Sequence, residues 1–218
     1  MNMLNTFIKP MHREGIKFIL IFSVISVILF FFYIPLGWVG IVLTIWCYYF
    51  FRDPKRTTPI RDGLLVSPAD GVISLIEKTM PPPELDIEKE VLTRISVFMN
   101  VFNCHVNRIP TSGRVEEIYY KPGKFLNASL DKASEENERN YFKIKTVKDD
   151  EEIIIVQIAG LIARRIVCEV EQGQDLKQGD RIGMIRFGSR VDIYFKNKKV
   201  LAKIGQNVVA GESLIASE

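Results

Sequence analysis

The chain has 218 residues, a formal net charge of +3 at pH 7, three cysteines and two histidines, and 47% of its residues are hydrophobic. The small net charge, without a run of Lys and Arg interleaved with aromatic residues, argues against a nucleic-acid-binding groove. An odd number of cysteines without CxxC spacing argues against a disulfide framework or a zinc site, and two histidines exclude a histidine-rich metal centre, so the sequence predicts no metal.

The N-terminal part is strongly apolar, and between Ile16 and Phe51 the only charged residue is Lys17. One continuous helix of this length would be about 54 Å long, which is too long for a hydrocarbon core of about 30 Å. We expect the helix to break at Pro35-Leu36-Gly37. The sequence therefore predicts a membrane-anchoring hydrophobic hairpin over residues 1–56, which either spans the bilayer or enters it as a re-entrant segment.

Basic residues flank both ends of this apolar stretch: Lys9, Arg13 and Lys17 on one side and Arg52, Lys55, Arg56 and Arg61 on the other. Positive residues favour the cytoplasmic side of a membrane. The sequence therefore predicts a protein of the cell membrane with its remaining residues on the cytoplasmic side.

Residues 57–218 consist of short β-like runs separated by turn residues, and no long segment with helical periodicity competes with them. The polar stretch from Asp131 to Asn140 is expected to form a solvated loop or a short helix. The sequence predicts a mainly β domain, with strands at residues 64–66, 71–76, 94–98, 113–120, 141–147, 153–159, 166–170, 181–187, 191–195 and 213–215.

Chemistry is concentrated in three segments of this domain. Gly188-Ser189 separates two of the β-like runs, and a Gly-Ser bond held at a turn can bring the serine hydroxyl close to the preceding carbonyl carbon. The other two segments are Ser67-Pro68-Ala69-Asp70-Gly71 and the run from Phe102 to Pro110, FNCHVNRIP. A Gly-Ser pair alone is most often an ordinary turn, so its interpretation depends on the other two segments.

Together the three segments resemble those of the phosphatidylserine decarboxylase proenzymes, in the short form found in bacteria and archaea. The resemblance runs from about Arg52 to the C-terminus. It implies that Ser189 attacks the carbonyl of Gly188, and that the chain is cut into a large chain of residues 1–188 and a small chain of residues 189–218. Ser189 would become a covalent pyruvoyl group, whose ketone forms a Schiff base with the substrate amine. The implied substrate is phosphatidylserine and the implied product is phosphatidylethanolamine.

A serine hydroxyl needs a neighbouring base, and a histidine has the most suitable unperturbed pKa near neutrality. His105 is the only histidine of the β domain. The resemblance places His105 and Asp70 at the site, and we expect Asp70 to orient the imidazole ring. His105 alone would more often be a structural histidine, and Asp70-Gly71 alone a common turn pair.

Two residues depart from the pattern of the longer family members. Arg108 stands where these members have a second histidine, so either His105 serves both self-cleavage and decarboxylation or Arg108 holds a substrate carboxylate or phosphate. Arg190 follows the serine where the longer members have threonine, and it is similar to the Gly-Ser-Arg of the short class.

The C-terminal run from Asn207 to Ile215 and the segment from Gln178 to Gly183 are similar to the hairpins of barrel-sandwich folds. The predicted fold is therefore a barrel-sandwich-like β domain that follows an N-terminal hydrophobic helical hairpin. The alternative function is a membrane-anchored lipoyl- or biotinyl-like carrier without catalysis. Such carriers modify a lysine in a Met-Lys-Met setting, which this chain lacks.

Overall fold

The computed structural model describes residues 9–85, 87, 90–124, 136–148, 150–160, 165–186 and 189–218. The chain divides into two compact units, Met1–Lys55 and Arg56–Glu218.

The first unit is a pair of packed helices, α2 (Arg13–Phe32) and α3 (Ile34–Phe50). The break falls at Tyr33, two residues before the expected position, because Pro35 is accommodated in the first turn of α3, where its missing N–H is not needed. Gly40 allows the helices to approach closely, since a Cβ there would lie 2.5 Å from Oγ of Ser26. Small residues permit this kind of contact between apolar helices.

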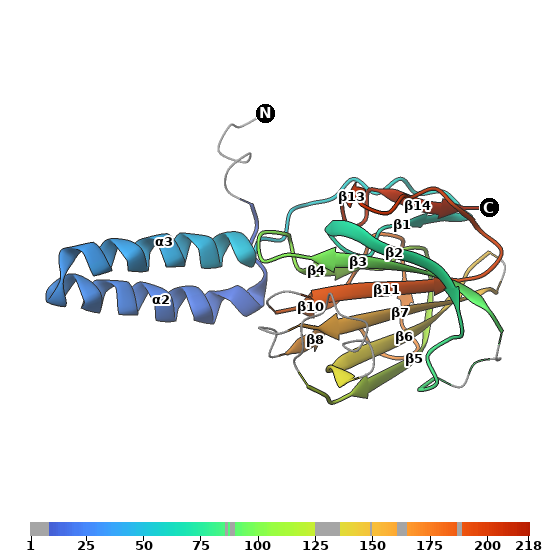
Figure 1. Cartoon of the computed structure of the whole chain (residues 1–218), viewed down its shortest axis with the longest axis horizontal. Coiled ribbons are helices and arrows are strands. Elements are labelled where there is room, and N and C mark those ends of the chain that lie inside the picture. The colour runs from blue at the N-terminus through green and yellow to red at the C-terminus, as the bar shows by residue number, and fades with distance from the viewer. Residues whose placement is uncertain are drawn as a thin grey trace. The chain divides into compact units, whose positions relative to one another are not determined.

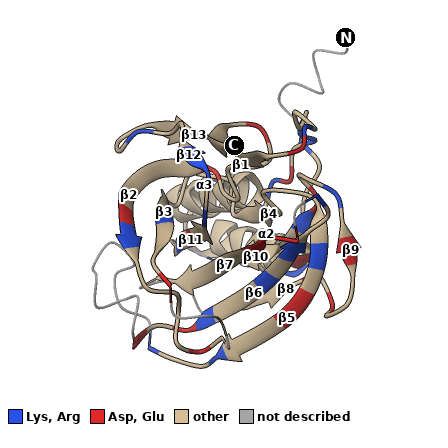
Figure 2. Ribbon diagram, turned by 90° about the vertical axis from the view of Figure 1, so that its right-hand side faces the viewer, with Lys and Arg blue, Asp and Glu red and all other residues tan. Residues whose placement is uncertain are grey.

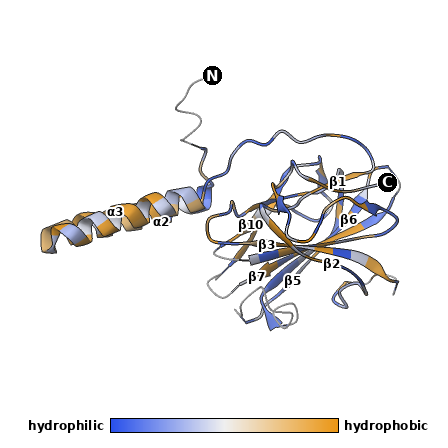
Figure 3. Cartoon of the chain, turned by 45° about the horizontal axis from the view of Figure 1, so that its top comes forward, coloured by the Kyte–Doolittle hydropathy of each residue, from blue (hydrophilic) through white to orange (hydrophobic). Residues whose placement is uncertain are grey.

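Hydrophobic residues occur along both helices of the hairpin (Figure 3), and many of the large ones are exposed. Phe31 and Phe32 are 86% and 80% exposed, and Trp38 is 62% exposed. By length and composition α2 could cross a membrane, whereas α3 is a shorter apolar helix. Large exposed apolar surfaces mark membrane or protein contacts.

The second unit is built on one eight-stranded antiparallel sheet in the order β13-β2-β3-β11-β7-β6-β5-β9 (Figure 1). This sheet curls into a half-barrel (Figure 2), and the mainly β fold with an N-terminal apolar hairpin is as predicted. Its strands are β2 (Gly71–Thr79), β3 (Leu92–Met99), β5 (Gly113–Lys121), β6 (Arg139–Thr146), β7 (Glu152–Ala159), β9 (Asp175–Leu176), β11 (Ser189–Phe195) and β13 (Asn207–Val208).

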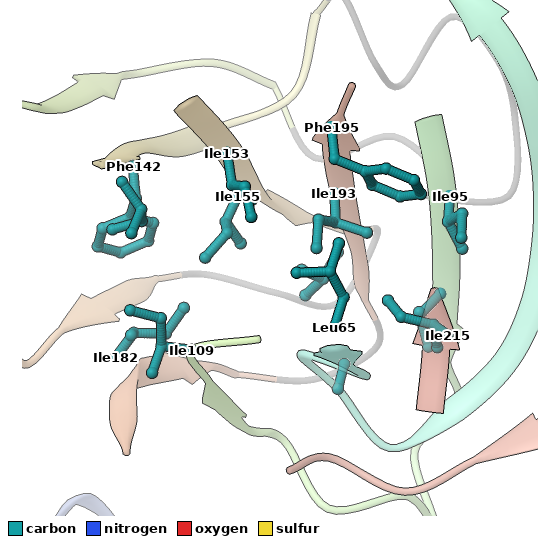
Figure 4. Close-up of a cluster of buried hydrophobic side chains, with 14 of the residues drawn as sticks. Leu65, Ile95, Ile109, Phe142, Ile153, Ile155, Ile182, Ile193, Phe195 and Ile215 are labelled. Carbon is teal, nitrogen blue, oxygen red and sulfur yellow. The ribbon is translucent and has the colours of Figure 1, made fainter. Parts of the chain in front are cut away.

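Two three-stranded sheets complete the unit, in the orders β1-β14-β12 and β4-β10-β8. Their strands are β1 (Leu64–Val66), β14 (Leu214–Ser217), β12 (Lys199–Val200), β4 (Val106–Arg108), β10 (Arg181–Ile185) and β8 (Ile166–Cys168). Side chains of both small sheets point toward the concave side of the large sheet (Figure 4). Leu65 and Ile215 come from one small sheet and Ile182 from the other, and all three belong to the main hydrophobic core.

Strand β11 lies between β3 and β7, and all seven of its residues are buried. Side chains alternate between the two faces of a strand. Val191, Ile193 and Phe195 enter the main core, whereas Tyr194 belongs to a second cluster with Leu85 and Leu92. The strand that begins at Ser189 is therefore fixed by packing on both faces, as expected of a central strand.

Candidate active site

Ser189 is the first residue of β11, and its position is defined on both sides. It pairs with Met99 of β3 and with Ala159 of β7. Its side chain is fully buried, and within the described part of the chain its Oγ has no hydrogen-bond partner. A buried hydroxyl without a partner is costly, so each one calls for an explanation. The expected partner in cleavage, Gly188, lies outside the described residues.

His105 lies immediately before β4, beside the end of β10. Val106 pairs with Met184, and the N–H of Ile185 donates to the carbonyl oxygen of His105 at 3.3 Å. The imidazole is fully buried, and its Nδ1 lies 3.0 Å from the carbonyl oxygen of Asn103. A carbonyl oxygen only accepts, so this contact requires a proton on Nδ1. In the neutral ring the lone pair is then on Nε2, the atom that would act as a base.

Asp70 has a different partner from the one expected. Both of its carboxylate oxygens accept from Nη2 of Arg56, at 2.9 and 2.8 Å, and Oδ1 also accepts from the N–H of Ala210 at 2.8 Å. Within the described residues Asp70 makes no hydrogen bond to His105. In this structure the carbonyl of Asn103, and not Asp70, contacts Nδ1 of the ring.

The next residue, Gly71, brings the turn that carries Asp70 close to β3. A Cβ at Gly71 would lie 2.1 Å from the backbone oxygen of Phe98, so only glycine fits there. Phe98 in turn pairs with Arg190 of β11. The turn is therefore tied to the strand pair that holds Ser189.

The structure brings all three sequence segments together, which the sequence alone did not establish. The N–H of Arg108 donates to the carbonyl of Pro68 at 2.9 Å, so the segment with His105 contacts the turn with Asp70. The same segment continues into β4, which pairs with β10. Because β10 ends at Ile185, four residues before Ser189, the three segments surround one region of the fold.

Arg108 is largely buried, and its Nη1 donates to the carbonyl oxygen of Gly179 at 2.8 Å. A Cβ at Gly211 would lie 3.0 Å from Cδ of Arg108, so the side chain also packs against the turn at Gly211. These contacts anchor part of the guanidinium group in the fold.

Three buried polar residues near Ser189 were not singled out from the sequence: Asn107, Gln157 and Asp192. Gln157 of β7 donates to Oδ1 of Asn107 at 2.8 Å, and both side chains are fully buried. On the opposite face of β11, Nε of Arg190 lies 2.9 Å from Oδ1 of Asp192. The signal that could have found Gln157 is a single amide inside the apolar run of β7.

A cavity of about 480 Å³ lies elsewhere in the β unit. Its lining includes Lys196 and Asn197, which follow β11, whereas Ser189 begins that strand. Polar and charged side chains such as Glu90 and Lys143 also line it. It is therefore at the opposite end of β11 from the candidate active site.

Comparisons with known proteins place the chain in an enzyme class. A family model described as phosphatidylserine decarboxylase matches residues 43–216. A phosphatidylserine decarboxylase proenzyme of Cereibacter sphaeroides is 58% identical over 216 residues, covering 99% of this chain and 93% of the relative. Proteins of the same name from Ruegeria pomeroyi and Pelagibacter ubique are 58% and 56% identical, and each alignment covers 99% or more of both chains.

The chain belongs to the phosphatidylserine decarboxylase family. This membership confirms the family that the three segments indicated, and with it the prediction of an enzyme. Nothing in these comparisons favours the alternative of a carrier without catalysis.

Proposed function

We propose that this chain is a self-processing decarboxylase that converts phosphatidylserine to phosphatidylethanolamine. In this proposal the precursor is cut between Gly188 and Ser189 into chains of residues 1–188 and 189–218. The observation that carries the proposal is the buried Oγ of Ser189, which lacks a partner among the described residues while it lies next to the segments of His105 and Asp70. The names of the relatives support the choice of substrate.

The residues at this position fit a pyruvoyl group derived from Ser189. The serine is held by strand pairing on both sides, and its unpartnered hydroxyl is the atom that processing would use. A pyruvoyl group supplies a carbonyl that accepts the electrons released when carbon dioxide leaves. The pairing of Ser189 with Met99 and Ala159 would hold that carbonyl in place.

His105 is proposed to move the protons of both processing and decarboxylation. With Nδ1 donating to the carbonyl of Asn103, Nε2 accepts the proton from Oγ of Ser189. The same atom returns a proton to the product after carbon dioxide leaves. No other histidine is present in residues 56–218, so in this proposal one imidazole serves both steps.

Asp70, in the turn before β2, and Arg108, the last residue of β4, are proposed to support the site. Asp70 places a negative charge at the turn, where Arg56 and the N–H of Ala210 hold it. Arg108 donates from Nη1 to the carbonyl oxygen of Gly179, and by the family resemblance its guanidinium group is proposed to hold a substrate carboxylate or phosphate. These roles rest on the family resemblance and on the contacts between their segments.

The N-terminal hairpin is proposed to hold the enzyme at the cell membrane with the catalytic domain on the cytoplasmic side. Its exposed apolar surface fits a bilayer, and the basic residues at both of its ends fit the cytoplasmic face. A diacyl lipid does not readily leave a bilayer, so an anchored enzyme meets its substrate at the same interface.

The proposal is tested by the intact mass of the purified full chain under denaturing conditions. The wild type should give two chains split between Gly188 and Ser189, with a small chain that lacks a free amino terminus. Ser189→Ala should remain uncut and inactive on phosphatidylserine. Ser96→Ala is a matched control, because Ser96 is also buried with an unpartnered Oγ but faces Asp192 on the other side of the sheet, so it should be cut normally. Processing of Ser189→Ala would overturn the cleavage site.

A further inference from the structure

A chain of three buried carboxamides runs toward the candidate active site. Nδ2 of Asn140 donates to Oε1 of Gln157 at 3.3 Å, and Nε2 of Gln157 donates to Oδ1 of Asn107 at 2.8 Å. Nδ2 of Asn107 then points at Sδ of Met99, 3.6 Å away. The three residues come from β6, β7 and β4, and all are buried.

The hydrogen bonds fix the direction of this chain. Oδ1 of Asn107 must accept from Gln157, so its NH₂ group faces Met99. Reversing every amide would instead aim an oxygen lone pair at the thioether sulfur, which has no hydrogen to donate. The chain therefore ends in an N–H donor whose acceptor among the described residues is a sulfur, a weak one.

This donor lies beside Ser189. Residues directly opposite each other in antiparallel strands share a face, and Met99 is directly opposite Ser189. Gln157 is opposite Val191, the next residue of β11 on that same face. The carboxamide chain thus reaches the face of the sheet that carries the buried Oγ of Ser189.

A weakly satisfied donor and an unpartnered hydroxyl therefore lie on one face, with Met99 contacting both positions. A buried polar network with an unsatisfied end is less stable than an apolar one, so packing alone does not account for it. Acyl transfer places negative charge on an oxygen, and a fixed amide donor stabilises such an oxyanion.

We propose that Asn107 stabilises the oxyanion of the self-processing reaction and that Gln157 is the positioning residue that holds Asn107. When Oγ of Ser189 bonds to the carbonyl carbon that precedes it, the hydroxyl proton passes to His105 and the carbonyl π electrons move onto oxygen. Nδ2 of Asn107 donates to that oxygen. When the C–O double bond re-forms, the C–N bond breaks and the amine of residue 189 takes a proton, leaving an ester. The inference rests on the self-processing proposed above.

The experiment follows the cutting of newly made full-length chain in cell-free translation with phosphatidylcholine nanodiscs, by intact mass over time. Asn107→Ala should slow cutting about 100-fold, the lower end of the effect of removing one oxyanion donor. Gln157→Ala should slow it about 10-fold, because Asn107 remains but is no longer held. Gln178→Ala is the matched control, since Gln178 is a buried amide bonded to the carbonyls of Leu64 and Pro110, and it should be cut at the wild-type rate.

A second variant separates oxyanion stabilisation from packing. Asn107→Asp keeps the shape and the acceptor for Gln157 but lacks the donor while its carboxyl is ionised. Protonation restores a donor, so its rate relative to wild type should rise as the pH falls from 8 to 5. Dividing the rate of Asn107→Asp by the wild-type rate at each pH removes the pH dependence that the two proteins share.

The outcomes distinguish this inference from the proposed function. A wild-type chain that stays uncut refutes self-processing itself. If the wild-type chain is cut, and Asn107→Ala and Asn107→Asp are both cut at the wild-type rate, the role of Asn107 is refuted while self-processing stands. The fold of each variant is measured in a Ser189→Ala background by circular dichroism. Unfolding of all Asn107 and Gln157 variants there would assign the carboxamides to the core and overturn the proposal.

Discussion

The buried ion pair that follows Ser189 on β11 makes that strand sensitive to the loss of either partner. The side chains of Arg190 and Asp192 are 4% and 1% exposed. Nη2 of Arg190 donates to Oδ2 of Asp192 at 3.1 Å, and Nε lies 2.9 Å from Oδ1. Arg190→Met keeps much of the apolar stem but removes both contacts, so the carboxylate of Asp192 loses its guanidinium partner inside the protein.

Breaking a buried ion pair by removing one partner costs about 3–5 kcal/mol, because the remaining charge is desolvated without compensation. Replacing both residues with apolar ones removes that penalty. We therefore expect Arg190→Met to lower the free energy of unfolding of the β domain by about 3 kcal/mol, the lower end of this range, because the charge of Arg94 still acts on Asp192. The double variant Arg190→Met/Asp192→Leu should recover most of the loss.

The assay is equilibrium denaturation of the full chain in detergent micelles, in a Ser189→Ala background that keeps all samples uncut. Circular dichroism of the β structure is the suitable signal, because Trp38 and Trp46 both belong to the hairpin and would not report on the β domain. A loss below about 1 kcal/mol in Arg190→Met, as is typical of an exposed ion pair, would refute the reasoning. A double variant no more stable than the single one would refute it equally.

Two further predictions concern His105 and Tyr194. His105→Ala should slow self-cleavage by about 10²–10⁴-fold, the usual effect of a general base, and normal cutting by intact mass would remove His105 from the site. Burial, followed by the charge of Asp192, raises the pKa of Tyr194 to about 12, above its ordinary value of 10. The unfolded chain therefore loses this proton first, and the contribution of Tyr194, fully present below pH 10, should decline between about pH 10 and 12 by roughly 2–3 kcal/mol. Tyr194→Phe should lack this share of the alkaline loss in denaturation curves, and identical curves would contradict the prediction.

The sequence predicted the long strands because their alternating or continuous apolar runs are intrinsic to each segment. The strand over residues 64–66 was predicted with its observed bounds, and the runs that became β5 and β7 were within one residue of them. The strands β9, β12 and β13 were missed because two residues are too few to show a period, and β4 was missed because only Val106 of its three residues is apolar. The predicted strand over residues 181–187 ends at Ile185 within the described residues.

The polar stretch from Asp131 to Asn140 shows how tertiary packing overrides composition. Residues 131–135 lie outside the described part, but Asn137, Glu138, Arg139 and Asn140 are all buried. The prediction of a solvated loop or short helix is therefore wrong for these four residues. Each gains a partner that only the folded chain supplies: Asn137, for example, donates to the carbonyl of Ala159, opposite Ser189.

The site could be predicted only as far as its local motifs. Ser189, His105 and Asp70 carried a recognisable pattern, whereas Arg56 was assigned to the basic flank of the hairpin. The structure instead places Arg56 in the β unit, where it binds Asp70 across 14 residues of sequence. Asn107 and Gln157 are 50 residues apart, and no local pattern connects them.

The proposed chemistry makes two opposite demands on the burial of Ser189. Self-processing needs water to be excluded, because the ester must open by elimination and not by hydrolysis, and the full burial of Ser189 and His105 meets this demand. Decarboxylation needs the same position to admit a serine headgroup. The proposed cut makes Ser189 the first residue of a separate chain. The N-terminal end of β11 then has no peptide bond to the preceding residue. The pairing of β11 with β3 and β7 would still hold position 189 in the sheet. Processing would thus relax the burial that it first required, while the reacting position stays fixed in the sheet.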